Sequence, residues 1–507
     1  MSEKRVVVIG AGPGALTASM LLASRGLRVD VFEAKPVVGG RNAPLRLGDF
    51  TFELGPTFLM MRFYLEEVFG LSGRRVEDYL DIRSLDPLYR LVFADGRELR
   101  VTSDHDAMKR QLEALVPGTG PAYQRWLDYE RIKFDHVTPC LKVPYSSLRA
   151  FATRRFVRAL PYLDAHKSLF THLGNYFENE QLRICFTFQA KYLGMSPWSC
   201  PGTFSLVPYI EHAAGIHHPM GGLHRISQAM AKVIEEHGGR IHLSSPVRRL
   251  LVENGRTTGV ELEDGSREKA DAVVLGSDFG YGLTHLIPES ALRRWTPRRL
   301  GRKKLSCSTF MLYLGLDKLY ADLPHHNIVF AEDYKRNVEE IADKLVLSDD
   351  PSFYMQNASV TDPGLAPPGM STLYVLVPVP NNRSGIDWDA QKAPFTKKVL
   401  GLLESRGGLA GLRSHIVESK VLTPLDWERD MHVYRGATFN LAHNIGQMLY
   451  FRPHNRFDDI DGLYLVGGGT HPGSGLPTIF ESGRISANLI LERFGMERLE
   501  GESGAER

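Results

Sequence analysis

The sequence predicts an α/β fold in which a domain built on a parallel sheet alternates along the chain with a second, α+β domain. Three observations lead to this prediction. A β-branched run, a glycine-rich turn, a helical pattern and a second strand open the chain. Long helical patterns fill much of residues 117–201, and strands mixed with helices follow them. A second glycine-rich segment, residues 467–484, then leads into the final helical pattern.

Length and composition exclude several classes of protein. At 507 residues the chain is too long for one ordinary core, so we expect two domains. Its 43% hydrophobic and 24% charged residues are typical of a globular protein, and a net charge of +2 argues against a nucleic-acid partner. Four widely spaced cysteines without a CxxC pair predict buried or neutral thiols in a reduced compartment, not disulfides or zinc ligands. They are Cys140, Cys185, Cys200 and Cys307.

The first strand, helix and strand have the pattern of a dinucleotide-binding unit. Residues 5–10 and 27–32 are typical of buried strands, and a helical pattern lies between them. Glu33, followed by Ala34, closes the second strand about 20 residues beyond the turn, where the motif places its ribose-binding acid. The helix N-terminus offers free N–H groups to a pyrophosphate. The turn itself consists of Gly10, Gly12, Pro13, Gly14 and Ala15. A purely structural glycine turn is the alternative.

A second glycine pair stands close after Glu33. Gly39, Gly40 and Arg41 resemble the second signature of the flavin-dependent amine-oxidase superfamily, in which backbone and arginine contact the phosphates. No second G-x-G-x-x-G unit offers a place for NAD(P), so we expect FAD. An ordinary turn with a surface arginine is the alternative here.

The loop after the strand of residues 50–58 supplies the next expected contact. Its bare backbone could lie against a flat ring. The residues concerned are Gly55, Pro56 and Thr57.

The remaining patterns divide the chain into five segments. An amphipathic helix ending near Ile234, a strand over residues 240–251 and hairpin turns at 253–255 and 263–265 indicate a return to the nucleotide domain. We therefore assign three segments to FAD binding, residues 1–105, 206–285 and 441–507. The helical residues 106–205 are assigned to the substrate and a membrane, and residues 286–440 to a substrate domain.

The C-terminal glycines are expected to return to the same cofactor. Residues 462–466 read as a short buried strand, and Pro477 suits the first turn of the helix that follows. The helix N-terminus would then direct its positive end at a ring that becomes negative on reduction. A structural turn is the alternative. The expected cofactor contacts are Val247, Gly467, Gly468, Gly469, Leu476, Pro477, Thr478 and Ile479.

Over nearly its whole length the chain resembles the bacterial carotenoid (phytoene) desaturase family. The resemblance rests on GAGPGA with Glu33, GGR, FELGPTF, residues 188–222, FRPHN at 451–455 and LYLVGGGTHPGSGLP at 463–477. It implies a Rossmann-type FAD-binding domain with an interleaved α+β substrate domain and a helical membrane-facing part. It also implies dehydrogenation of an acyclic carotenoid precursor, phytoene or a C30 diapo-analogue, by hydride transfer to flavin N5 and loss of a proton.

Two features leave alternatives open within this resemblance. Gly468 stands where other flavin oxidases of this fold usually have an acid, which is typical of the carotenoid branch. Glu481 replaces a less polar run of many lycopene-forming members, and it either bears on the product or complements the helix dipole as a first-turn acid. Oxygenation of a terminal methyl, saturation or isomerisation are alternative reactions. A non-catalytic prenyl-lipid escort protein is the alternative from another class.

The sequence names neither a catalytic base nor a metal site. A cation delocalised over the polyene makes a strong fixed base unnecessary. The histidines that could suggest a metal stand beside proline and glycine within a family segment, so we expect no metal there. They are His217, His218 and His224.

A hydrocarbon substrate is expected to bring the protein to a membrane. Each buried CH₂ gains ~0.8 kcal/mol on leaving water, so the substrate stays in the bilayer. Two basic stretches suggest peripheral attachment to anionic lipid: residues 293–304, with Trp295 at the interface, and residues 149–163, where arginines alternate with Phe151, Phe156 and Leu160. Each could equally be a solvated face.

No apolar run approaches the ~20 residues that span a bilayer. We expect a cytoplasmic protein, peripheral to the membrane. Because no NAD site is visible, a quinone or dioxygen is the expected electron acceptor.

Overall fold

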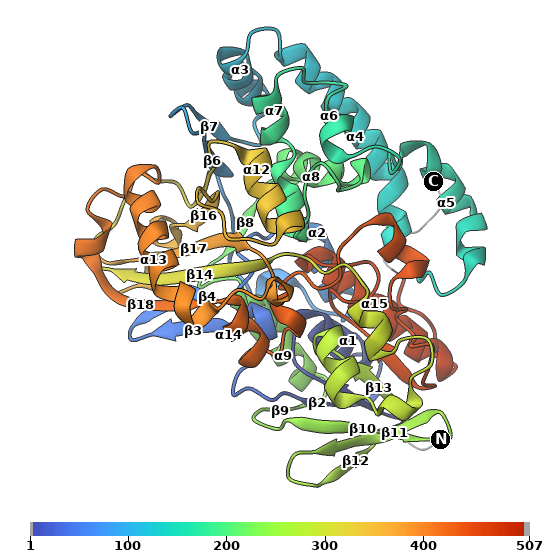
Figure 1. The fold of residues 1–507 in the computed structure, drawn as a ribbon. Coiled ribbons are helices and arrows are strands. Elements are labelled where there is room, and N and C mark those ends of the chain that lie inside the picture. The colour runs from blue at the N-terminus through green and yellow to red at the C-terminus, as the bar shows by residue number, and fades with distance from the viewer. Residues whose placement is uncertain (1–3, 501–507) are drawn as a thin grey trace.

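The computed structural model describes residues 4–500 and contains a five-stranded parallel sheet at the centre of one domain (Figure 1). Its strand order is β19-β13-β1-β2-β9, and every neighbouring pair is parallel. Segments far apart in the sequence therefore build one sheet, as the motifs predict. The strands are β1 (Arg5–Ile9), β2 (Arg28–Phe32), β9 (Arg240–His242), β13 (Ala272–Leu275) and β19 (Leu463–Leu465).

Alternate residues of these strands build two different cores. Val6 and Val8 of β1 belong to a cluster with four helices on one face of the sheet, whereas Val7 and Ile9 pack towards a three-stranded antiparallel sheet on the other. This is the two-residue period of a strand buried on both faces. The helices are α1 (Pro13–Ala23), α2 (Arg62–Leu71), α9 (His224–Glu236) and α15 (Leu476–Arg493). The small sheet contains β10 (Val247–Glu253), β11 (Arg256–Leu262) and β12 (Arg267–Lys269).

The strand predicted over residues 240–251 is two strands. β9 ends at His242, Ser244 has a φ of 50°, and β10 begins at Val247. Pro246 has no N–H to donate to a ladder, which explains why one continuous strand does not form. The predicted hairpin is present: Asn254 and Gly255 both have positive φ, 50° and 74°, between β10 and β11.

The second domain is built on a seven-stranded sheet of order β18-β14-β17-β16-β15-β6-β7. All its pairs are antiparallel except β15 with β6. Helix α13 (Trp388–Ser405) covers one face (Figure 1), where Phe395 contacts Phe310. The strands are β6 (Tyr89–Val92), β7 (Glu98–Val101), β14 (Ser308–Leu316), β15 (His326–Val329), β16 (Phe353–Gln356), β17 (Ser371–Val379) and β18 (Ile416–Leu422). β6 and β7 thus join this sheet from within residues 1–105, the segment that we assigned to FAD binding.

The predicted helical part is present and forms its own core around Trp126, whose ring lies 4.8 Å from that of Phe186. Its helices lie above the two sheets in Figure 1. No helix within residues 4–500 is long and apolar enough to cross a bilayer. The main helices are α3 (His105–Leu115), α4 (Gly120–Leu141), α5 (Arg154–Ala159), α6 (Leu169–Leu173), α7 (Glu180–Cys185) and α8 (Leu206–Ala214). All four cysteines are free and buried, as predicted.

Candidate dinucleotide-binding site

The N-terminal turn and the acid after β2 lie against each other. Gly10, with a φ of 87°, donates its N–H to Phe32 at 2.8 Å, directly beyond the end of β1. The buried Glu33 carboxylate accepts the N–H groups of Ala11 at 2.6 Å and Lys35 at 2.9 Å. Each carboxylate oxygen keeps a second lone pair, which leaves Glu33 able to accept a hydrogen bond from a ribose.

Val247 is the first residue of β10, and the two serines shortly before it lie beside Glu33. The N–H of Ser245 donates to the Glu33 carbonyl at 2.8 Å, and that of Ser244 donates to Lys35 at 3.0 Å. Ala34, between the two acceptor residues, is exposed. The structure therefore brings Val247 and Ala34 to the same end of the sheet as Glu33.

The second glycine pair packs against the first turn. Gly39, with a φ of 116°, donates to the Ala11 carbonyl at 2.8 Å, and a Cβ on Gly40 would lie 3.5 Å from the Gly12 Cα. Arg41 is held from the far side, by the Thr438 carbonyl at 2.5 Å. The predicted group GGR is thus next to the predicted phosphate turn.

The C-terminal glycines meet the same turn. A Cβ on Gly14 would lie 3.0 Å from the Gly467 nitrogen and 3.1 Å from the Ile479 Cγ2, and a Cβ on Gly483 would lie 2.6 Å from the Gly14 carbonyl oxygen. Helices α1 and α15 therefore cross at glycines, with their N-terminal ends side by side. Leu476 and Pro477 form the first two positions of α15, and the Thr478 hydroxyl donates to carbonyls of the preceding turn.

Both helix N-termini are free to bind an anion. Gly12 caps α1 and Gly475 caps α15, and neither offers a side chain to the first-turn N–H groups. A Cβ on Gly467 would have no atom within 4 Å, and one on Gly12 would have only the Gly276 oxygen, at 3.9 Å. Open space beside two uncapped helix ends fits a dinucleotide.

Gly468 and Gly469 are required for packing. A Cβ on Gly468 would lie 2.7 Å from the Ser474 Oγ, and one on Gly469 would lie 2.4 Å from the Phe279 Cβ. These glycines let the turn fold back on its own chain. Their contact with a cofactor stays a prediction.

Three tyrosines of the seven-stranded sheet, of which Tyr313 and Tyr374 are buried and Tyr354 is half-buried, hold the loop at residues 54–57. Tyr313 donates to the Leu54 carbonyl at 2.5 Å, Tyr374 donates to the Gly55 carbonyl at 2.6 Å, and Tyr354 donates to Thr57 Oγ1 at 2.9 Å. Burial raises the pKa of all three hydroxyls, so they stay protonated donors. These bonds fix the loop to the seven-stranded sheet of the second domain.

Gly55 is the residue at which this loop meets the GGR segment, because a Cβ added at this position would lie 2.7 Å from the Arg41 carbonyl oxygen. Pro56 follows at the partly exposed edge of the loop. The second domain therefore completes one wall of the site.

Sequence analysis missed Asp278, which orients Arg41. Its buried carboxylate lies 3.4 Å from the Arg41 Nη2 and accepts the Asn440 amide at 2.6 Å and the Gly280 N–H at 3.0 Å. Burial raises its pKa, against the opposing effect of Arg41. The available signal was its position, because Asp278 follows β13 much as Glu33 follows β2.

The interpretation of Glu481 as a first-turn acid is wrong. Glu481 is the sixth residue of α15, is buried and forms an ion pair with Arg484, at 2.6 Å between Oε2 and Nη2. Burial raises the pKa of this carboxyl, and Arg484 opposes the shift. The partner stands one turn further along the helix, which accounts for a buried acid without any helix-dipole role.

The expectation that Trp295 lies at a membrane interface is also wrong. The side chain is 1% exposed and packs edge-on against Phe279, at 5.3 Å between ring centroids. The Arg299 guanidinium carbon and the Lys303 Nζ lie 5.3 and 5.5 Å from the centroid of the indole ring. The basic residues cover the indole ring and hold it within the protein.

Two of the three histidines, His218 and His224, each lie beside a different carboxylate. His218 Nε2 lies 3.0 Å from the Asp362 Oδ2, and His224 Nδ1 lies 3.8 Å from the Glu53 Oε2. No group of three potential metal-ligating side chains occurs in the part of the chain that the structure describes.

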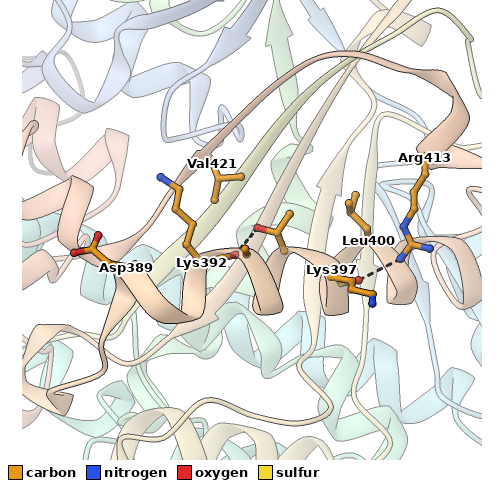
Figure 2. A pocket seen from close by; sticks show the side chains of 8 residues that line it. Asp389, Lys392, Lys397, Leu400, Arg413 and Val421 are labelled. Atoms are coloured by element: carbon orange, nitrogen blue, oxygen red, sulfur yellow. Dashed lines mark hydrogen bonds between the residues drawn. The ribbon is translucent and has the colours of Figure 1, made fainter.

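An open hollow of about 510 Å³ lies between α13 and β18, at the outer edge of the seven-stranded sheet. Figure 2 shows Lys392 and Lys397 on the helix and Val421 on the strand, with the Arg413 guanidinium donating to the Lys397 carbonyl at 3.2 Å. None of the predicted site residues lines it. The candidate site is therefore defined by the converging glycine turns and not by this hollow.

Comparisons with known proteins agree with this geometry. A family model described as flavin containing amine oxidoreductase matches residues 16–491. The chain is 51% identical over 492 residues to a 4,4′-diapophytoene desaturase (4,4′-diapolycopene-forming) of Methylomonas sp, covering 97% of this chain and 96% of that protein. It is 38% identical over 507 residues to the all-trans-zeta-carotene desaturase of Myxococcus xanthus, with coverages of 99% and 96%. A crystal structure of an oxidoreductase from Methanosarcina mazei has a TM-score of 0.63 at 18% identity, covers 96% of this chain and 100% of its own, and supports the fold alone.

Proposed function

The chain belongs to the flavin-containing amine oxidoreductase family and, within it, to the carotenoid desaturases, and from this premise we propose that it dehydrogenates 4,4′-diapophytoene with bound FAD. The contact of Gly14 with Gly467 and Ile479 carries the cofactor part of this proposal. It places two uncapped helix N-termini beside one open space, which a dinucleotide can fill.

Identity to the relatives supports the choice of a C30 substrate. The chain is 51% identical to the desaturase named for 4,4′-diapophytoene and 38% identical to the desaturase named for zeta-carotene. Both alignments cover nearly the whole chain, so the difference does not arise from one conserved domain. A C40 precursor such as phytoene is the competing substrate.

The residues of the chain bind and orient, and FAD would supply hydride acceptance at N5 when bound. Glu33 would accept a hydrogen bond from the adenosine ribose, and the N-termini of α1 and α15 would face negative groups of the cofactor. Arg41, held by Asp278 and Thr438, would contact the phosphates. The developing positive charge spreads over the polyene, so we assign no base.

We assign membrane contact to the segment of residues 148–160. Leu148, Val157 and Leu160 are 62%, 52% and 50% exposed. Four exposed arginines surround them: Arg149, Arg154, Arg155 and Arg158. Apolar side chains among exposed arginines suit an anionic bilayer surface. This would place the protein at the cytoplasmic face of a membrane.

The residues just before this segment connect it to the candidate site. The ring of Tyr145 lies 5.6 Å from that of Phe151 and 5.0 Å from that of His471, in the C-terminal glycine segment. The Lys142 carbonyl accepts a hydrogen bond from Arg484 of α15 at 3.1 Å. A substrate leaving the bilayer here would therefore arrive next to the turn that we assign to the flavin.

The proposal is tested with purified protein, FAD and liposomes that contain either 4,4′-diapophytoene or phytoene. Products are identified by chromatography and mass spectrometry, with quinone under anaerobic conditions or with dioxygen as the acceptor. We expect loss of two hydrogens per step, faster from the C30 substrate, and one acceptor that sustains turnover. Gly14→Val is the matched control, because its side chain would enter the contact with Gly467.

Conversion of neither substrate by protein that retains FAD would refute the desaturase activity. Equal or faster conversion of phytoene would refute the C30 assignment. Products that gain oxygen, or retain their mass with altered geometry, would instead support an oxygenase or an isomerase.

A further inference from the structure

Arg452 is a fully buried cation behind the C-terminal glycine turn. Its side chain is 0% exposed. Nη2 donates to the Gly468 carbonyl at 2.5 Å, and Nε donates to the Thr470 carbonyl at 3.0 Å. Two further bonds reach the carbonyls of Gln447 at 3.2 Å and Leu441 at 3.3 Å. The guanidinium thus joins the turn to the segment that precedes it.

Within residues 4–500 no carboxylate lies within ion-pair distance of this guanidinium, and its four bonds all go to main-chain carbonyls. Burial lowers the pKa of Arg452 to about 9, which is still above neutral pH, so the guanidinium remains positively charged there. His443 and His471 lie close, and burial together with the Arg452 charge lowers their pKa values, so both rings stay neutral and leave the Arg452 charge unbalanced. Burying an unpaired charge is strongly unfavourable, so its retention here requires a reason.

The hydrogen bonds transmit this charge to the other side of the turn. A trans peptide directs its N–H opposite to its C=O. Since the Gly468 carbonyl points at Arg452, the N–H of the same peptide, which belongs to Gly469, points away from it. The neighbouring Gly467 has open space where a Cβ would stand, and it touches Gly14 of the phosphate turn. The positive end of α15 adds potential of the same sign.

We propose that Arg452 is a positioning residue that makes the glycine turn electropositive and thereby favours the reduced, negatively charged state of the bound flavin. The inference rests on the proposed FAD binding. It goes beyond that proposal, because it assigns a part of the redox poise to a residue behind the turn. A purely structural brace would account for the four hydrogen bonds but not for the missing counter-charge.

The test is the midpoint potential of the bound flavin, measured by redox titration without substrate. Arg452→Met removes the charge and Arg452→Lys keeps it. Gln447→Met is the matched control, because its side chain braces the same segment through Lys304 at 2.9 and 2.8 Å without carrying charge. A tenfold change in the ratio of affinities for reduced and oxidised flavin corresponds to about 30 mV for this two-electron couple.

We expect Arg452→Met to lower the potential by about this amount, while Arg452→Lys and Gln447→Met leave it near that of the wild type. An unchanged potential in Arg452→Met, or an equal fall in all three variants, would overturn the inference. If Arg452→Met loses its FAD, the inference is tested on the wild type. A midpoint potential of its bound flavin that is no higher than that of free FAD overturns the inference as well. A folded wild type that binds no FAD refutes the proposed function itself, and with it this inference.

Discussion

Replacing Gly483 by alanine tests the contact that joins the two ends of the chain. The added Cβ would lie 2.6 Å from the Gly14 carbonyl oxygen and 2.7 Å from the Thr17 Cβ. Ordinary contact begins at 3.4 Å, so α15 must move away from α1 by the difference, about 0.8 Å. Overpacking of this kind costs about 1–3 kcal/mol. We expect a lower Tm, by about 1 °C for each kcal/mol, because an unfolding entropy of about 2.1 cal/mol/K per residue sums to about 1 kcal/mol/K over 507 residues.

The same displacement weakens FAD binding, because the turn at Gly467 and the first turn of α15 move with the helix. A loss of about 1.4 kcal/mol is a tenfold weaker Kd. Titration of apoprotein with FAD, with scanning fluorimetry on the same samples, measures both effects. Gly70→Ala is the control, because that helical glycine has no atom within 4 Å of an added Cβ. Wild-type values of both Tm and Kd in Gly483→Ala would refute the crossing of α1 and α15 at this residue.

Three further predictions concern other parts of the chain. The first replaces the four exposed arginines of residues 148–160 by glutamine: Arg149, Arg154, Arg155 and Arg158. Each replacement removes about 1 kcal/mol of attraction to anionic liposomes, so we expect co-sedimentation to be lost, whereas the same change at Arg298, Arg299 and Arg302, beside the buried Trp295, leaves binding largely intact. Undiminished binding by the first variant would contradict the assignment of membrane contact to residues 148–160. Tyr374→Phe leaves the Gly55 carbonyl without its donor, which destabilises the protein by about 1–3 kcal/mol in urea unfolding and weakens FAD binding, and an unchanged unfolding curve would count against it. Asp461 binds Arg493 through both oxygens, at 2.7 and 2.8 Å, and this ion pair lowers the pKa of Asp461 to about 2 from 3.8. The ion pair therefore stabilises the folded state fully above about pH 4, and this stabilisation is lost as the pH falls towards 2. Asp461→Asn should lower the free energy of unfolding by about 1 kcal/mol at pH 7, after solvent screening, and by less at pH 3. The same loss of free energy at both pH values would contradict the ion pair.

The parts of the site that depend on local sequence were predictable. Gly10 and Glu33 belong to one strand-turn-helix-strand unit, and the structure places Glu33 against that turn. The return of the C-terminal strand to the same sheet also followed from its pattern, as β19 beside β13 confirms. Such motifs are readable because neighbouring residues build them.

Contacts between distant segments were not predictable. The hydroxyl of Tyr313 holds the Leu54 carbonyl across 259 positions of sequence, and no local pattern around either residue indicates that pair. The burial of Trp295 depends on Phe279 and on the fold of its own basic neighbours, so a pattern of arginines around an aromatic ring could not distinguish a membrane face from a covered core. Arg452 stood in a quoted motif, but its role follows only from the carbonyls around it.

The most direct test of the account is the stoichiometry of FAD on the folded protein. Apoprotein is titrated with FAD at equilibrium, and bound cofactor is counted from flavin absorbance after removal of the excess. The convergence of the Gly14 and Gly467 turns predicts one FAD per chain in the wild type and none in Gly14→Val. Folded wild-type protein that stays colourless in excess FAD would contradict the central claim.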